Sequence, residues 1–272
     1  ALEGVRQEAL GQRDGTDLLV ISLSATDVIG HAFGPDSREI QDHLVRMDRW
    51  LGGFLDSLAA LVPRDRTVLA LTADHGVVSF PEASHARGEP GGRVSLREIA
   101  QNAASAFFAR YRTDFQFGFE NGLLYADTEA LRARGVDVDS LAAAMAAEAR
   151  QLEGVEKVYT PATLKGSPDP EAARWRKAIP HDLGWLLAAS PERGWIWITT
   201  LGVAMHGTTQ PDDVLVPIAF MGPGIHAGRY ERTVSVVDIG TTLAALIGVR
   251  PTEPVEGVVL PEVAKRGAVS GE

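Results

Sequence analysis

The chain of 272 residues contains no cysteine. This absence excludes disulfide bonds, zinc sites built on thiolates and a cysteine nucleophile. It leaves the cellular compartment open, because a chain without thiols suits reducing and oxidising surroundings alike. The sequence also lacks any uninterrupted apolar run near the roughly 20 residues that a membrane-spanning helix requires, so no membrane span is predicted.

Positive charge is scarce. Lys and Arg number 26 against 36 Asp and Glu, which gives a formal net charge of −10 and argues against a nucleic-acid-binding surface. Apolar residues make up 45% and charged residues 23%, as in ordinary globular proteins. The length suits one large domain or a domain with an insertion.

Several common catalytic signatures are missing from the sequence. It has no G-x-S-x-G elbow, no Walker A sequence and no G-x-G-x-x-G turn. The chain begins at Ala1 with neither an initiator methionine nor a signal-peptide pattern. We therefore expect that an upstream segment was removed or that the chain is part of a longer protein.

The apolar pattern predicts an α/β fold. Residues 18–23 form a nearly continuous apolar run, which is typical of a strand buried on both faces. Apolar residues then recur at helical spacing over 38–61, and residues 67–72 form a second apolar run. Strand, helix and strand in this order predict a βαβ unit with two parallel strands, and hence a mostly parallel sheet flanked by helices.

The middle of the chain alternates between helical and extended patterns, which predicts an α+β cap inserted into the core. We assign residues 1–78 and 202–272 to the core and residues 79–201 to the cap. Helices are expected at 96–111 and 140–152, and strands at 123–125, 155–159 and 195–198. The main sheet is expected to resume at 214–221, before a helix at 238–247.

Acidic and histidine residues follow both predicted core strands. Asp27 and His31 come after the first, and Asp74 and His75 come after the second. Because ligands of open α/β sheets bind beyond the carboxyl ends of the strands, these four side chains are expected around one crevice. Carboxylate and imidazole groups are the zinc ligands that remain when thiolates are absent. Two such ions can clamp the oxygens of a phosphoryl displacement.

Each of these residues also has a simpler interpretation. An Asp-His pair after a strand is often a turn, and acid–histidine pairs four residues apart are common on helices. His206, taken alone, fits a surface loop. His85 lies in a glycine-rich stretch and is a candidate for substrate contact, whereas His43 and His226 are interpreted as solvent-facing and His181 stays open.

Taken together, these segments resemble the alkaline phosphatase superfamily. The likeness rests on SATDVIGHAFGP at 24–35, TADHG at 72–76, HGT at 206–208 with Asp213, and VPIAFMG at 216–222, and it extends to the helix at 236–248. The branch it resembles is that of bacterial alkaline phosphatases related to nucleotide pyrophosphatase/phosphodiesterases. The likeness runs over nearly the whole chain.

The resemblance implies a site with two zinc ions. Asp27, His31 and His206 match the ligands of one ion, and Asp74 and His75 match two ligands of the other. In the family a Ser or Thr attacks phosphorus in line, and water then hydrolyses the phosphoenzyme.

One departure from the family pattern concerns the nucleophile. Relatives carry an upstream segment with a further metal-binding Asp and the Ser or Thr nucleophile, so no catalytic nucleophile is identified in this chain and the second zinc site is incomplete. Thr26 and Thr72 do not occupy the nucleophile's motif and are interpreted as structural. Leu215 also stands where many relatives have a histidine.

The resulting hypothesis is a phosphoric ester hydrolase, an alkaline phosphatase or phosphodiesterase, acting on a small-molecule phosphate ester. As an isolated chain it is expected to be inactive and to self-associate unless the missing N-terminal segment is present. The resemblance implies a periplasmic or secreted location. The alternatives are a catalytically silent interaction module of the same fold, and a phosphoglycerate-mutase-like or sulfatase-like enzyme with manganese or calcium.

Overall fold

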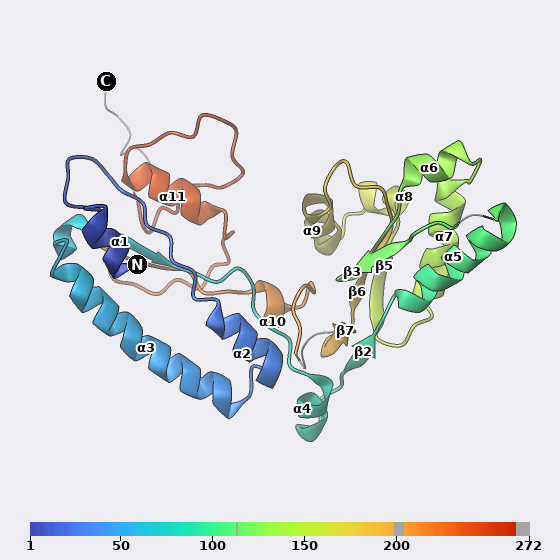
Figure 1. Cartoon of the computed structure of the whole chain (residues 1–272), viewed down its shortest axis with the longest axis horizontal. Coiled ribbons are helices and arrows are strands. Elements are labelled where there is room, and N and C mark those ends of the chain that lie inside the picture. The colour runs from blue at the N-terminus through green and yellow to red at the C-terminus, as the bar shows by residue number, and fades with distance from the viewer. Residues whose placement is uncertain (113, 199–203, 265–272) are drawn as a thin grey trace. The chain divides into compact units, whose positions relative to one another are not determined.

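A computed structural model of the chain describes residues 1–112, 114–198 and 204–264 (Figure 1). The chain forms two compact units. Unit 1 comprises residues 1–26, 41–74 and 216–272, and unit 2 comprises residues 27–40 and 75–215. The predicted boundary between cap and core at residues 201 and 202 lies outside the described residues.

Unit 1 contains a short two-stranded ladder and several helices. Strand β1 (Leu69–Leu71) pairs antiparallel with β8 (Ala219–Met221). The helical elements wholly within this unit are α1 (Leu2–Gln7), the 3₁₀ turn η1 (Arg64–Arg66) and α11 (Asp238–Leu246). Helices α2 (Ala25–Phe33) and α3 (Arg38–Ala59) each contribute residues to both units.

The prediction for residues 18–23 is wrong. Within the part of the chain that the structure describes, this segment belongs to no strand, and the side chains of Leu18 and Val20 are 73% and 81% exposed. The expected parallel pairing with residues 67–72 is therefore not formed, and β1 pairs with β8 instead. A strand buried on both faces needs neighbouring elements to cover it, and the exposure of this segment shows that the described residues leave it uncovered.

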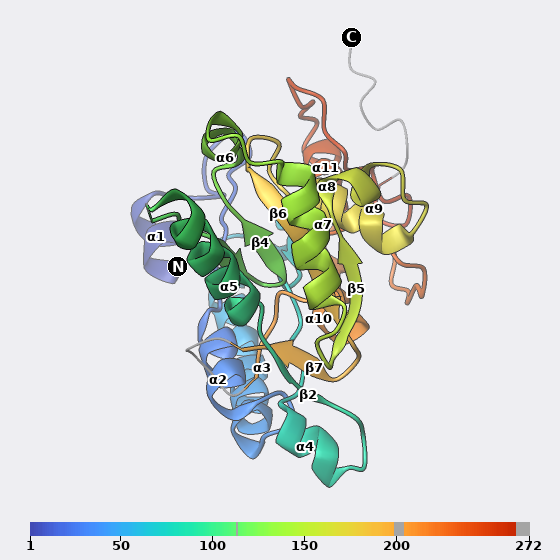
Figure 2. The same ribbon diagram turned by 90° about the vertical axis from the view of Figure 1, so that its right-hand side faces the viewer.

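Unit 2 is built on a four-stranded antiparallel sheet in the order β3-β4-β6-β5. Its strands are β3 (Gly118–Glu120), β4 (Leu123–Tyr125), β5 (Val155–Tyr159) and β6 (Trp185–Pro191). Helices α5 (Arg97–Tyr111) and α7 (Val138–Ala149) lie along the sheet (Figure 2). A separate parallel ladder joins β2 (Gly92–Val94) to β7 (Trp195–Trp197).

The remaining helices of unit 2 are short. They are α4 (Pro81–Ala86), α6 (Thr128–Ala133), α8 (Pro161–Lys165), α9 (Pro170–Ala178) and α10 (Pro211–Val214). The helices expected at 38–61, 96–111, 140–152 and 238–247, and the strands expected at 123–125, 155–159 and 195–198, are confirmed with small shifts at their ends. None of the described helices is both long and apolar enough to cross a membrane.

The hydrophobic cores found among the described residues both belong to unit 2. The larger core packs the sheet against α5 and α7, with Leu124, Leu131 and Leu186 fully buried. A smaller core lies between the sheet and helices α8 and α9. Unit 1 differs, because most of the large exposed hydrophobic side chains of the described chain belong to it.

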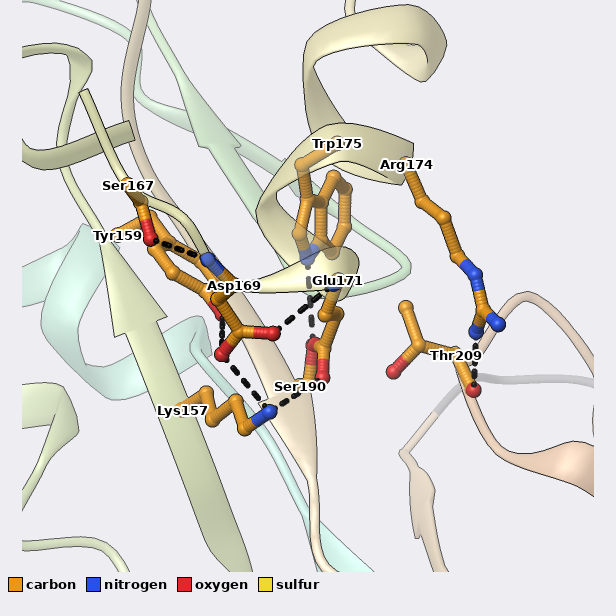
Figure 3. Close-up of polar contacts among 9 residues, drawn as sticks. All are labelled: Lys157, Tyr159, Ser167, Asp169, Glu171, Arg174, Trp175, Ser190 and Thr209. Atoms are coloured by element: carbon orange, nitrogen blue, oxygen red, sulfur yellow. Dashed lines mark hydrogen bonds and ion pairs between the residues drawn. The ribbon is translucent and has the colours of Figure 1, made fainter. Parts of the chain in front are cut away.

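A polar network fixes α9 to the sheet of unit 2 (Figure 3). Asp169 caps the helix by accepting the Glu171 backbone N–H, and Lys157 on β5 lies 2.9 Å from Asp169 and 3.3 Å from Glu171. Ser190 on β6 donates to Glu171 and accepts the Trp175 indole N–H at 3.2 Å. Burial and the neighbouring carboxylates raise the pKa of Tyr159, whose hydroxyl donates to Asp169 at 2.9 Å.

Helix α9 also reaches the loop that follows His206. The Arg174 guanidinium donates to the Thr209 backbone carbonyl at 3.3 Å (Figure 3). The helix therefore holds one of the loops that carry the candidate site.

Candidate metal centre

Asp27 and His31 lie one helical turn apart on α2. Residues four positions apart share a helix face, so the two side chains meet, and His31 Nε2 lies 3.4 Å from Asp27 Oδ1. The His31 ring is held by its other nitrogen, since Nδ1 lies 2.9 Å from the Ala204 backbone carbonyl. A carbonyl only accepts, so Nδ1 is the donor in this contact and Nε2 is the ring nitrogen that faces Asp27.

His206 joins this pair from a distant part of the sequence. Val78 and Met205 form an antiparallel bridge, and His206 follows directly. The His206 Nε2 atom lies 3.1 Å from His31 Nε2 and 3.7 Å from Asp27 Oδ1. Asp27, His31 and His206 thus offer three ligand atoms that lie within 4.8 Å of one another.

His75 faces the same carboxylate. Its Nε2 atom lies 3.7 Å from Asp27 Oδ1, and its Nδ1 atom lies 2.7 Å from the Gly76 carbonyl. The His75 ring stacks on His206, with centroids 3.6 Å apart and planes 16° from parallel. Three imidazoles of unit 2 therefore direct their Nε2 atoms at one acidic side chain.

The electrostatics of this cluster favour the neutral form of His206. Burial lowers the pKa of His206, and the neighbouring His75 and His31 lower it further, against an opposing effect of Asp27. A neutral ring keeps the lone pair that a metal ligand requires. The three histidine side chains retain about a quarter of their exposure, so a small molecule has access to them.

The spacing of Asp27, His31 and His206 fits a tetrahedral cation. Zinc bound to imidazole nitrogen and carboxylate oxygen places neighbouring ligand atoms roughly 3.3 Å apart. The corresponding distances here are 3.1, 3.4 and 3.7 Å. Carboxylate plus two imidazoles is also a donor set that leaves a position open for substrate or water.

Asp213 is a buried acid beside the cluster. It is 2% exposed, and its carboxylate accepts the Thr208 backbone N–H at 2.5 Å. Burial raises the pKa of Asp213, while the hydrogen bond from Thr208 acts in the opposite direction. Its backbone carbonyl accepts the Gly76 N–H at 2.6 Å.

The structure brings together four of the site residues expected from the sequence: Asp27, His31, His75 and His206. Asp74 directly precedes His75 in the chain, has an exposed side chain and belongs to unit 1, so its position beside these four stays a prediction. His85 lies near the end of α4, where its Nε2 atom is 2.9 Å from the Gly91 carbonyl. Its role in substrate contact also stays a prediction.

Sequence reasoning assigned no role to the contacts of Asp213 or to the glycine after each of two histidines. A Cβ atom on Gly76 would lie 2.1 Å from the Asp212 carbonyl oxygen. Gly207 has a φ of +88° and packs against the Asn121 side chain. The repeated His-Gly pair is the signal in the sequence that could have indicated close backbone packing at both places.

Comparison with known proteins identifies the family. The family model for type I phosphodiesterase / nucleotide pyrophosphatase matches residues 2–209. The chain belongs to this family. The superfamily resemblance inferred from the sequence is thereby confirmed.

Relatives of this chain include proteins named as alkaline phosphatases. The chain is 27% identical to alkaline phosphatase PhoV of Synechococcus elongatus, over 97% of the chain and 48% of the relative. It is 31% identical to alkaline phosphatase PhoK of a Sphingomonas species, over 97% of the chain and 50% of the relative. The chain thus spans about half the length of the curated relatives that it matches.

Solved structures confirm the predicted alkaline-phosphatase-like α/β fold. The crystal structure of wild-type alkaline phosphatase PafA matches with a TM-score of 0.86 at 24% identity, over 96% of this chain and 50% of that one. Murine ectonucleotide pyrophosphatase / phosphodiesterase 5 matches with a TM-score of 0.60 at 16% identity, over 85% of this chain and 54% of that one. These likenesses concern the fold.

Proposed function

We propose that the chain is part of a phosphoric ester hydrolase, an alkaline phosphatase or phosphodiesterase, that depends on two zinc ions. The observation that carries the proposal is the convergence of three imidazole Nε2 atoms on Asp27 Oδ1. Membership of the phosphodiesterase family favours this reaction over those of the sulfatases and phosphoglycerate mutases.

Asp27, His31 and His206 would hold the first ion, and Asp74 and His75 would supply two ligands of the second. When bound, zinc supplies Lewis-acid polarisation of phosphoryl oxygens and activation of an attacking oxygen. The stacked contact between His75 and His206 supports the proposal that the two zinc sites are neighbours, because these two residues are assigned to different ions.

The protein's own contribution is to hold these side chains before substrate arrives. The Ala204 carbonyl fixes the tautomer and orientation of His31, and the Gly76 carbonyl lies within hydrogen-bonding distance of His75 Nδ1. The acidic group of Asp27 lies in an exposed part of the cluster, where a small phosphate ester has access. A ligand set held in place in this way would take up its cations without rearrangement, and the bound cations would orient an anionic group.

The nucleophile is proposed to lie outside this chain. Thr26 Oγ1 is 3.0 Å from His43 Nε2, and the Thr72 hydroxyl donates to the Ala73 carbonyl, which agrees with structural roles for both. The exposed apolar residues 18–23 support a further segment that covers unit 1 in the active protein. We also propose that residues 1–78 and 202–272 act as the core and 79–201 as the cap.

The test uses the longer protein encoded by the gene, assayed with p-nitrophenyl phosphate and bis-p-nitrophenyl phosphate. Removal of metal by a chelator is expected to abolish turnover, zinc is expected to restore it, and Asp27→Asn is expected to prevent that restoration. The preferred ester distinguishes a phosphatase from a phosphodiesterase. Full activity in chelator, with no bound metal by elemental analysis, would refute the proposal.

The second candidate function is that of a catalytically silent interaction module. The exposed apolar surface of unit 1 favours it, because such surfaces mark contacts with other polypeptides. Assays of both the 272-residue chain and the longer protein, with an aryl phosphate and added zinc, distinguish the two. Little or no turnover is expected of the chain alone under both proposals, whereas only the first predicts turnover by the longer protein.

A further inference from the structure

Two loops carry His75 and His206 of the candidate centre, and Asp213 contacts both. Its backbone carbonyl accepts the Gly76 N–H at 2.6 Å, one residue after His75. Its carboxylate accepts the Thr208 N–H at 2.5 Å, two residues after His206. A single residue at the end of α10 therefore connects two segments that are far apart in the sequence.

The main-chain contact on the His75 side is close. Val77 N–H donates to the Asp212 carbonyl at 3.1 Å, next to the bond between Gly76 and Asp213. A Cβ atom on Gly76 would lie 2.1 Å from the Asp212 oxygen, so this approach requires glycine. The loop after His75 consequently lies directly against the α10 backbone.

The contact on the His206 side depends on a buried hydrogen-bond acceptor. Asp213 is 2% exposed, and a carboxylate loses much hydration at such a position. Thr208 N–H supplies a hydrogen bond there, and the Thr208 hydroxyl in turn accepts the Gln210 N–H at 3.2 Å. The loop from residue 206 to residue 210 is thus anchored on α10 by the side chain of Asp213.

Resting on the proposed function, we infer that Asp213 is a positioning residue that sets the separation of His75 and His206. Because these histidines are assigned to different ions, Asp213 couples the two metal sites. A displacement of either loop would shift one ring of the stacked pair, which now has a centroid separation of 3.6 Å. Two-metal sites work at a metal–metal distance of about 3.5–4 Å, so small shifts are expected to matter.

The experiment measures cation affinity, which a role in fold stability alone would not change. Zinc is titrated into the metal-free 272-residue chain by calorimetry, and the d–d absorption of bound Co²⁺ reports the coordination geometry. Asp213→Ala releases the Thr208 N–H and is expected to weaken zinc binding about 10-fold, the lower end of the loss seen when a ligand's own hydrogen-bonding partner is removed, and to alter the cobalt spectrum. Asp213→Asn, which keeps an acceptor for Thr208 N–H, is expected to bind zinc within about threefold of the wild type.

Asp212→Asn is the matched control, because it neutralises an exposed carboxylate on the same turn and is expected to leave zinc binding unchanged. Melting temperatures of the metal-free variants separate affinity from stability. If Asp213→Ala does not fold, Asp213→Glu replaces it. This variant keeps the charge but displaces the acceptor, and it is expected to weaken binding at least about fivefold.

The outcomes separate this inference from the proposed function. Wild-type affinity and an unchanged cobalt spectrum in Asp213→Ala, or in Asp213→Glu, would overturn the inference while Asp27→Asn still abolishes binding. Equal losses in Asp212→Asn and Asp213→Ala would overturn it too. A wild-type chain that binds neither zinc nor cobalt would overturn the proposed function, and the inference with it.

Discussion

The imidazole rings of His75 and His206 stack face to face, 3.6 Å between centroids, although the two residues lie far apart in the sequence. Two protonated rings at this distance would repel each other, and His75 contributes to the lowered pKa of His206. Both Nε2 atoms lie 3.7 Å from Asp27 Oδ1. The stacked pair is therefore suited to present lone pairs rather than charge to an incoming ligand.

The first prediction concerns Asp27, the acid that the three histidines share. Asp27→Asn removes the negative charge of a proposed ligand. It is expected to weaken zinc binding more than 100-fold, since the loss of a group that only hydrogen-bonds to a ligand already costs about 10–100-fold. Calorimetric titration of the metal-free chain measures this. Asp36→Asn is the control, because Asp36 pairs with Arg87 and Ser79 elsewhere in unit 2. Equal affinities in both variants would contradict a ligand role for Asp27.

The second prediction concerns acid stability. The Lys157 ammonium, with hydrogen bonds from Glu171 and Tyr159, lowers the pKa of Asp169 from 3.8 to about 2. A carboxylate with a depressed pKa stabilises the fold at pH values above its pKa in the unfolded chain. This contribution is lost as the pH falls through about 2. Lys157→Met is expected to lower the melting temperature at pH 7 and to flatten its decline between about pH 4 and pH 2.

Thermal unfolding followed by circular dichroism across this pH range tests the prediction. Lys165→Met removes an exposed cation of α8 and is expected to leave the pH curve unchanged. Parallel curves for Lys157→Met and the wild type would show that Lys157 does not stabilise the ionised carboxylate.

The third prediction concerns the backbone contact at Gly76. Gly76→Ala would place a methyl group 2.1 Å from the Asp212 carbonyl oxygen, so the loop must shift. A loss of about 1–3 kcal/mol in the free energy of unfolding is expected, with weaker zinc binding. Gly52→Ala, in an exposed and open position on α3, is expected to gain up to about 1 kcal/mol. Urea denaturation measures both, and a neutral Gly76→Ala would contradict the close approach.

The fourth prediction concerns the exposed apolar segment of unit 1. Val20 is 81% exposed, so Val20→Lys is expected to reduce self-association of the isolated chain without loss of stability. Light scattering over a concentration series measures this. Phe108→Lys, at a 46% exposed position of unit 2, is the control and is expected to have little effect. A wild-type chain that stays monomeric at high concentration would contradict the prediction.

The sequence predicted local structure well where one face of an element is buried within unit 2. The helix expected at 140–152 and the strand expected at 155–159 both matched the structure, as α7 and β5, because these elements pack in the same core. Residues 18–23 failed for the opposite reason. Their composition predicts burial on two faces, but the neighbours that such burial needs are absent from the described chain.

The candidate site was also predicted only in part. The spacing of Asp27 and His31 on one helix predicts their contact, and resemblance to the superfamily added His206. The position of Asp213 could not be predicted, since its role depends on hydrogen bonds to two loops that only the folded chain brings together. Backbone contacts of this kind cannot be predicted from residue types, apart from the glycine that permits the close approach.

The bridge between Val78 and Met205 has a consequence for how proteins of this kind diversify. The chain leaves His75 and returns to His206 next to this bridge. The stretch between the two histidines therefore begins and ends at the same place. Insertions and deletions in that stretch are expected to leave the two histidines side by side if they spare the contacts of Arg174, Gly194 and Trp195 with residues 209 and 210. Changes of length there are thus expected to alter the surroundings of the histidines rather than the spacing between them.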